Sequence, residues 1–141
     1  MRELTIAVAV LFATFHAGAS DTGPLIQPPP ELLGTWYWTL PDGSCTETHT
    51  YEPDGSRLVT SGKEELTGSY TVRRTSDPRF LELLVKTNTD NKGQDCGGDS
   101  ADDSGKSFNI FVTLVRGGQL LFCFEPNLNE CYGPFRKRSA A

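Results

Sequence analysis

The residues best suited to acid–base chemistry form one short alternating series, Glu47, His49 and Tyr51. Residues two apart in an extended strand point to the same side, so all three side chains would share a face. A carboxylate beside an imidazole orients the ring and tunes its proton affinity, and a tyrosine hydroxyl adds a donor. Such a face either binds a polar group inside a barrel or contacts solvent. Polar strand faces are commonly solvated, so we favour solvent, although the intervening threonines leave the direction of the face open.

Further catalytic groups are scarce. His49 is the only histidine after His16, and the chain has no Gly-x-Ser-x-Gly sequence and no glycine-rich phosphate loop. Serine and cysteine nucleophiles need a nearby base, and no pair of the many carboxylates stands out for glycoside-type chemistry. We therefore expect a protein that is not an enzyme and needs no cofactor. A hydrolase or isomerase built on Glu47 and His49 is the alternative.

The four cysteines indicate disulfide bonds rather than a metal site. The sequence has no Cys-x-x-Cys pair, and with so few histidines we expect no metal. Four cysteines allow three pairings. Cys123 and Cys131 lie symmetrically about Asn127 in a predicted hairpin, where directly opposed residues are close enough to be bridged. Cys45 then pairs with Cys96 and closes a loop of about fifty residues, worth about 4 kcal/mol in the chain-entropy model.

A long polar segment, residues 88–106, contains Cys96 and five aspartates. Loops of this length inside a compact domain are usually functional or disordered. The carboxylates could ligate calcium, but an EF-hand alignment puts Lys92 where an oxygen ligand belongs. We interpret the segment as a mobile, solvated loop pinned at its cysteine, and as a candidate contact site for a protein partner. The aspartates are Asp90, Asp95, Asp99, Asp102 and Asp103.

The N-terminal residues indicate export. Residues 1–3 are a short charged start, residues 4–15 are apolar, and Ala17-Gly18-Ala19 offers small residues for cleavage. This is the pattern of a signal peptide over residues 1–19, cleaved after Ala19, and it is too short for a membrane anchor. The mature chain is then expected to be secreted or periplasmic, where cysteines oxidise. A net charge of −5 disfavours nucleic acid as a partner, and no second apolar run is long enough to span a membrane.

The remaining sequence predicts an all-β domain. Residues 20–31 are a Pro-rich flexible tether, and residues 32–138 form one domain. Short apolar segments separated by turn sequences, such as the repeated Pro-Asp-Gly-Ser at 41–44 and 53–56, indicate about eight strands. We expect a single antiparallel up-and-down meander that closes into a barrel, because closure removes exposed edges. The expected strands cover residues 34–40, 45–52, 57–61, 66–74, 80–87, 107–114, 119–125 and 130–136.

Three sequence segments resemble a known family. Leu32-Leu33-Gly34-Thr35-Trp36 is similar to the Gly-x-Trp signature that opens lipocalin-like, calycin-type barrels. Residues 51–55 and 68–72 look like the second and fourth strands of small bacterial lipocalin-like proteins. The resemblance implies a barrel in which the tryptophan plugs one end and Arg136 or Arg138 packs across it. It also implies a small hydrophobic ligand inside the barrel.

The side chains that could line such an interior are aromatic or belong to the polar series. They are Trp36, Trp38, Glu47, His49, Tyr51, Tyr70, Phe108 and Phe122. The same aromatic residues would equally serve as the core of a filled barrel, since eight strands leave room for either arrangement. In that case we expect a non-enzymatic interaction or inhibitor module that presents the loop 88–106 to another protein.

Overall fold

The computed structural model describes residues 23–139, which form nine β-strands and no helix. The predicted signal peptide lies outside the described residues. All eight predicted strands are present, with ends within a few residues of those expected. The strands are β1 (Leu25–Ile26), β2 (Gly34–Thr39), β3 (Thr46–Tyr51), β4 (Ser56–Ser61), β5 (Glu64–Arg74), β6 (Leu81–Asp90), β7 (Ser107–Val115), β8 (Gln119–Cys123) and β9 (Cys131–Lys137).

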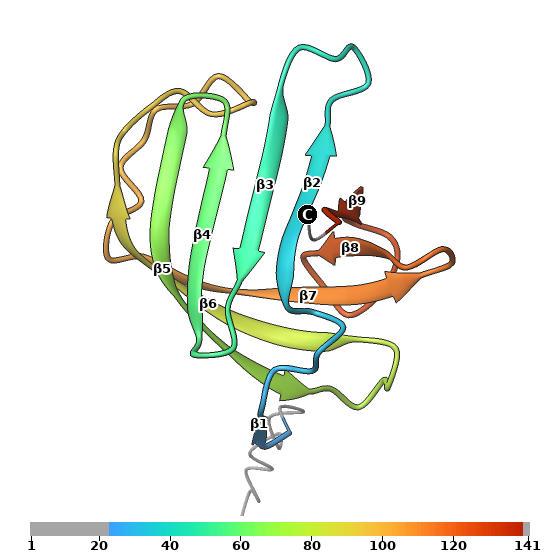
Figure 1. The fold of residues 1–141 in the computed structure, drawn as a ribbon. Coiled ribbons are helices and arrows are strands. Elements are labelled where there is room, and N and C mark those ends of the chain that lie inside the picture. The colour runs from blue at the N-terminus through green and yellow to red at the C-terminus, as the bar shows by residue number, and fades with distance from the viewer. Residues whose placement is uncertain (1–22, 140–141) are drawn as a thin grey trace, which may run out of the picture.

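Strands β2 to β9 form one closed antiparallel barrel (Figure 1). Each strand pairs with the next in sequence, and β9 pairs back with β2 through the register Trp36–Lys137 and Tyr37–Arg136. Pro134 has no N–H, which limits how far this last ladder extends. The predicted all-β meander is therefore confirmed, and the closed barrel is consistent with a lipocalin-like fold. No helix that could cross a bilayer occurs among residues 23–139.

Antiparallel order gives the barrel two distinct ends. We call the end where β2 begins, at Gly34, the floor end, and the end where β2 finishes, at Thr39, the loop end. The connections β2–β3, β4–β5 and β6–β7 lie at the loop end, and the long β6–β7 connection runs beside β5 there (Figure 1). The N-terminal segment with β1 lies at the floor end.

The two Pro-Asp-Gly-Ser sequences form matching turns. In one, the Asp42 carboxylate accepts hydrogen bonds from the Ser44 backbone N–H (2.9 Å) and hydroxyl (2.6 Å). Asp54 and Ser56 repeat this arrangement at 2.8 and 2.6 Å. The glycine of each turn has a positive φ, as left-handed turn positions require. The turn prediction is confirmed.

The segment interpreted as a tether contains a short strand that the sequence did not reveal. In β1, Leu25 pairs with Arg73 and Ile26 with Val72 of β5. Strand β5 is 11 residues long and its other neighbour β4 has 6, so β4 leaves part of one β5 edge open at the floor end. Because an unpaired strand edge invites association with other chains, β1 protects it.

Trp36 closes the floor end, as expected. The indole is 1 % exposed, and its Nε1 donates a hydrogen bond to the carbonyl oxygen of Leu32 at 2.8 Å. The cation across the ring is Lys137, whose Nζ lies 5.3 Å from the ring centroid. The expectation that Arg136 or Arg138 covers the tryptophan is therefore wrong. Lys137 is the residue of β9 that pairs with Trp36, and cross-strand partners point to the same face.

Both predicted disulfides are formed. Cys45 bonds to Cys96 at the loop end and thereby fixes the β6–β7 connection to the start of β3. Cys123 bonds to Cys131 and closes the hairpin between β8 and β9. Two disulfides in so short a chain are typical of an oxidising, extracellular or periplasmic environment.

Candidate functional site

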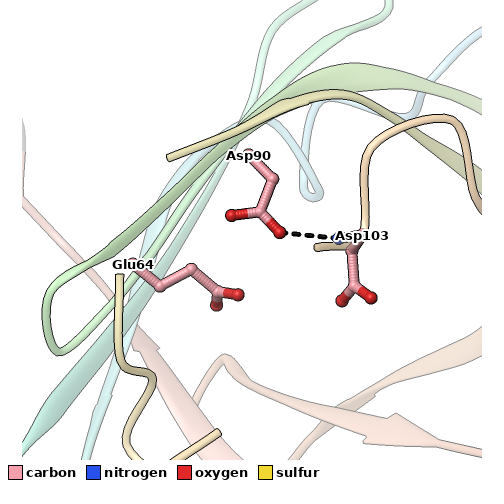
Figure 2. Close-up of side chains that lie close together, drawn as sticks. All are labelled: Glu64, Asp90 and Asp103. Carbon is pink, nitrogen blue, oxygen red and sulfur yellow. Dashed lines mark hydrogen bonds between the residues drawn. The ribbon is translucent and has the colours of Figure 1, made fainter. Parts of the chain in front are cut away.

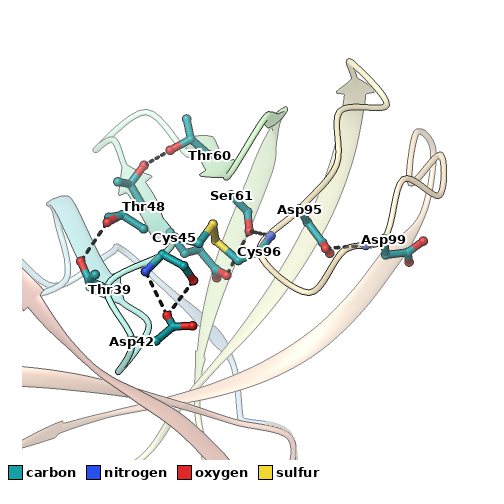
Figure 3. The surroundings of a disulfide bond; sticks show 12 residues. Thr39, Asp42, Cys45, Thr48, Thr60, Ser61, Asp95, Cys96 and Asp99 are labelled. Atoms are coloured by element: carbon teal, nitrogen blue, oxygen red, sulfur yellow. Dashed lines mark hydrogen bonds between the residues drawn. A yellow bond between two sulfur atoms is a disulfide. The ribbon is translucent and has the colours of Figure 1, made fainter.

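The polar series of β3 faces the inside of the barrel. His49 is 4 % exposed and Tyr51 is also buried, while Glu47 on the same face is half-buried. The solvent-facing interpretation is therefore wrong. The intervening threonines take the outer face, where hydroxyl pairs such as Thr48 and Thr60 bond across strands (Figure 3). Threonine suits either face of a strand, which is why the sequence could not decide the direction.

His49 is held by Glu47 within the barrel. Its Nε2 lies 2.6 Å from Glu47 Oε1, and the other carboxylate oxygen of Glu47 accepts a hydrogen bond of 3.4 Å from the Ser61 hydroxyl. Burial lowers the pKa of His49 below its usual value, and this outweighs the opposite influence of the carboxylate. The ring is therefore neutral near pH 7. The contact assigns the proton to Nε2, so that Nδ1 is an acceptor.

An aromatic cluster fills the barrel around His49. Phe122 has its ring centroid 4.7 Å from both His49 and Phe135, and Tyr51 meets Tyr70 edge to face at 4.9 Å. Burial raises the pKa of Tyr51 to about 12, against the opposing influence of the neighbouring Arg57 guanidinium. Aromatic pairs at these separations add to the stability gained from burial. The interior at this level is thus a packed core.

Of the other predicted ligand-binding residues, Trp38 and Tyr70 pack in or against the core, and Phe108 does not. Trp38 is half-buried beside Tyr132 and Phe135, at 6.1 and 5.8 Å between ring centroids. Tyr70 donates its hydroxyl hydrogen bond to the Glu52 carbonyl at 2.6 Å. Phe108 near the start of β7 is 47 % exposed and stands apart from the cluster. The structure therefore brings most of the predicted residues together as core, with Trp36 at the floor.

Sequence reasoning missed several buried polar residues, among them two on the inward faces of the strands. Arg57 on β4 and Thr87 on β6 are buried on the same inward faces as Val59 and Val85. The Nε of Arg57 and the Oγ1 of Thr87 have no hydrogen-bond partner among the described residues, and neither has Nδ1 of His49. The sequence signal for a buried Arg57 was that it alternates with Val59 on one face of the strand. A charged residue at the start of a short strand is nevertheless normally expected to be exposed, so this signal was missed.

Three carboxylates meet at the loop end. The side chains of Glu64, Asp90 and Asp103 point toward a common space (Figure 2), where one carboxylate oxygen from each residue lies within 4.8 Å of the other two. Asp90 also accepts a hydrogen bond from the Asp103 backbone N–H at 2.7 Å. Burial, followed by the charges of these and other nearby acids, raises the pKa of Glu64 to about 7. Oxygen ligands in this arrangement are of the kind that could hold a hard cation.

Hydrogen bonds hold the acidic loop, residues 88–106, against the barrel. Lys63 donates its backbone N–H to the Gln94 carbonyl at 2.9 Å, and Cys96 donates its own to the Ser61 hydroxyl at 3.0 Å. Within the loop, Asp95 receives the Asp99 backbone N–H at 2.8 Å (Figure 3). These bonds and the Cys45–Cys96 disulfide give the loop a defined shape, which the sequence did not predict.

An apolar cleft of about 520 Å³ lies at the floor end. It is bounded by the N-terminal segment, the β5–β6 and β8–β9 connections and the ends of β6, β7 and β8. Arg74 and Arg79 lie among its otherwise mostly apolar walls, and Leu114 is 48 % exposed there. Apolar residues in the lining include Leu32, Phe80, Leu81, Val112, Leu114 and Leu120. Volume and lining are those of a small-molecule site.

The class of protein is defined here by architecture alone: a closed, disulfide-braced antiparallel barrel with an apolar cleft at one end. No family model, no curated protein and no solved structure matches this chain.

Proposed function

We propose that this protein is an exported, non-enzymatic binding protein of lipocalin-like type that takes up a small hydrophobic molecule. The observation that carries the proposal is the apolar cleft at the floor end, whose volume of about 520 Å³ suits a molecule of drug size. Because the packed aromatic cluster fills the middle of the barrel, the cleft is the better site for such a molecule. Val112 and Leu120 belong to both the core and the cleft, so a bound molecule would extend the core outward.

The test compares two exposed leucines. Leu114 lies in the cleft, whereas Leu84 of β6 is similarly exposed, at 42 % against 48 %, and does not line it. A titration with the neutral hydrophobic dye Nile red should show saturable binding that Leu114→Lys weakens about tenfold or more, because the lost apolar contact is worth about 1.5–3 kcal/mol. Leu84→Lys should bind the dye as the unchanged protein does. Equal binding by both variants would refute the cleft.

A second candidate function is an interaction module that presents the acidic loop. The observations that favour it are the filled interior and the fixing of the loop by the Cys45–Cys96 disulfide. Removal of residues 99–104 distinguishes the two functions, because these residues lie outside the cleft. A ligand carrier should keep its dye affinity after this deletion, whereas an interaction module should lose its protein partner.

A further inference from the structure

Two exposed leucines extend the apolar cleft to the outside of the molecule. Leu114 near the end of β7 is 48 % exposed, and Leu128 in the β8–β9 connection is 58 % exposed. Both side chains line the cleft at the floor end. Exposed apolar surface that is rimmed by polar residues marks a place where a protein or a membrane binds. The charges around these leucines indicate which of the two fits.

Arginines lie on the same rim. Arg74 and Arg79 line the cleft. Arg116 directly follows Val115, which also lines it. A tight turn between β7 and β8, in which Gly118 donates its backbone N–H to the Val115 carbonyl at 3.2 Å, holds Arg116 in this place. All three arginines are exposed to solvent.

Acidic side chains cancel only part of this positive charge. Asp77 forms an ion pair of 2.6 Å with Arg79, and Glu31 also lines the cleft. No ion pair among residues 23–139 includes Arg74 or Arg116. The β3–β4 connection and the end of β9 add equal numbers of acids and cations at the floor end, namely Glu52, Asp54, Lys137 and Arg138. The rim therefore keeps an excess of positive charge.

Strand β5 separates this charge from the acids of the molecule. The strand begins at Glu64, in the acidic cluster, and ends 11 residues later at Arg74, on the cleft. At about 3.3 Å per residue, the two ends are about 30 Å apart along the strand. Salt screens exposed charges over about 10 Å at 0.1 M ionic strength. A surface that touches the floor end therefore interacts with the arginines and only weakly with the acidic cluster, although the chain has a net charge of −5.

We propose that the floor end docks on the surface of an anionic lipid bilayer. Arg74 and Arg116 contact the lipid phosphates, which suit the planar guanidinium, and Leu114 and Leu128 enter the apolar layer below them. A bilayer, unlike a folded partner, needs no matching shape to accept two separate leucines. In this orientation the cleft opens toward the lipid and the acidic loop end faces away from it. The docking surface goes beyond the binding function proposed above and does not require it.

Flotation with lipid vesicles tests the docking. The protein should float with vesicles of phosphatidylcholine and phosphatidylglycerol in equal parts, and not with vesicles of phosphatidylcholine alone. Binding to the mixed vesicles should weaken as salt is added, because the attraction is electrostatic. Equal binding to both kinds of vesicle would overturn the proposal. Binding to neither would also overturn it and would favour an acidic protein as the partner of the rim.

Matched variants locate the docking surface. Arg116→Gln should bind the mixed vesicles about fivefold more weakly, the value of one basic residue near an anionic leaflet. Arg136→Gln removes an equal charge from an exposed position of β9 outside the cleft and should bind normally. Leu128→Ser should weaken binding about tenfold, whereas Leu84→Ser, outside the cleft, should not. If the two arginine variants bind alike, the proposal is wrong.

Nile red binding, measured without vesicles, separates this proposal from the binding function. Because Arg116 does not line the cleft and the dye is uncharged, Arg116→Gln should bind the dye as the unchanged protein does. A protein that floats with the mixed vesicles but binds no dye would refute the binding function and support the docking surface. A protein that binds the dye but does not float would overturn the docking surface alone.

Discussion

At the floor end, Leu32 and Trp36 are buried against each other, and apolar side chains continue from the core into the cleft. At the loop end, by contrast, acidic side chains gather and a disulfide fixes the longest connection between strands. The floor end is held by apolar burial, which needs no partner outside the chain. The loop end instead keeps three carboxylates within 4.8 Å of one another, an arrangement that charge repulsion opposes. The Cys45–Cys96 disulfide adds a covalent crosslink at the same end. The difference suggests that the two ends serve different purposes.

Removing the floor indole should have the largest effect. Trp36→Ala should lower the free energy of unfolding by about 3–5 kcal/mol, because it leaves a large cavity in a fully buried position. Urea unfolding followed by circular dichroism measures the change. Trp38→Ala, in a half-buried position at the other end of β2, is the control and should cost clearly less. Equal losses would mean that the floor is no better packed than the rest of β2.

The two disulfides should differ in what they contribute. Cys45 and Cys96 are 51 residues apart, and Cys123 and Cys131 are 8 apart. In the chain-entropy model the longer loop stabilises by about 4 kcal/mol and the shorter by about 2.5 kcal/mol. Double replacement of each pair by serine, followed by urea unfolding, checks the order. If removing the Cys123–Cys131 disulfide lowered the free energy of unfolding more than removing Cys45–Cys96, the stabilising role of the crosslink at the loop end would be contradicted.

The acidic cluster should make stability depend on pH. The pKa of Glu64 is raised in the folded state to about 7 from an ordinary value of 4.5, so folding favours its protonated form. Its contribution is fully present below about pH 4.5 and is lost as the pH rises through 7. The free energy of unfolding of Glu64→Gln, relative to that of the unchanged protein, should therefore rise as the pH increases from 4.5 to 8. Of the three changes in stability predicted here, this one should be the smallest.

The matched control for this pH dependence is Glu65→Gln, which alters the adjacent exposed glutamate outside the cluster. It should show no such gain. The comparison must be made between variants, because the lowered pKa of buried His49 acts in the opposite direction. That contribution is present above about pH 6.5 and is lost as the pH falls. A stability difference for Glu64→Gln that does not change with pH would contradict the account of the cluster.

Much of the architecture could be predicted from local patterns. The Pro-Asp-Gly-Ser turns, the alternating strands and the symmetry of Cys123 and Cys131 are short-range signals, and each was confirmed. Strand β1 was missed because two residues carry no periodicity, and its pairing depends on the unequal lengths of β4 and β5. The surroundings of a side chain depend instead on which face of its strand points into the barrel. Threonines on both sides of His49 left that direction undecided until the neighbouring strands were placed.

The candidate sites were harder to predict, for the same reason. The cleft joins residues from the N-terminal segment with residues almost ninety positions later, such as Ile26 and Leu114, and no local pattern connects them. Arg57 and Thr87, the buried polar residues that were missed, flank Gly68 in the sheet, and only the strand register reveals this.

The central claim is that small hydrophobic molecules bind at the floor end of the barrel. Mapping Nile red binding by nuclear magnetic resonance of the ¹³C-methyl groups tests it most directly. The account predicts saturable shifts and dye contacts at Leu114, Leu120 and Val112, with the methyl groups of Leu84 and Leu58 unaffected. Contacts confined to the loop end, or spread evenly over exposed leucines, would contradict it.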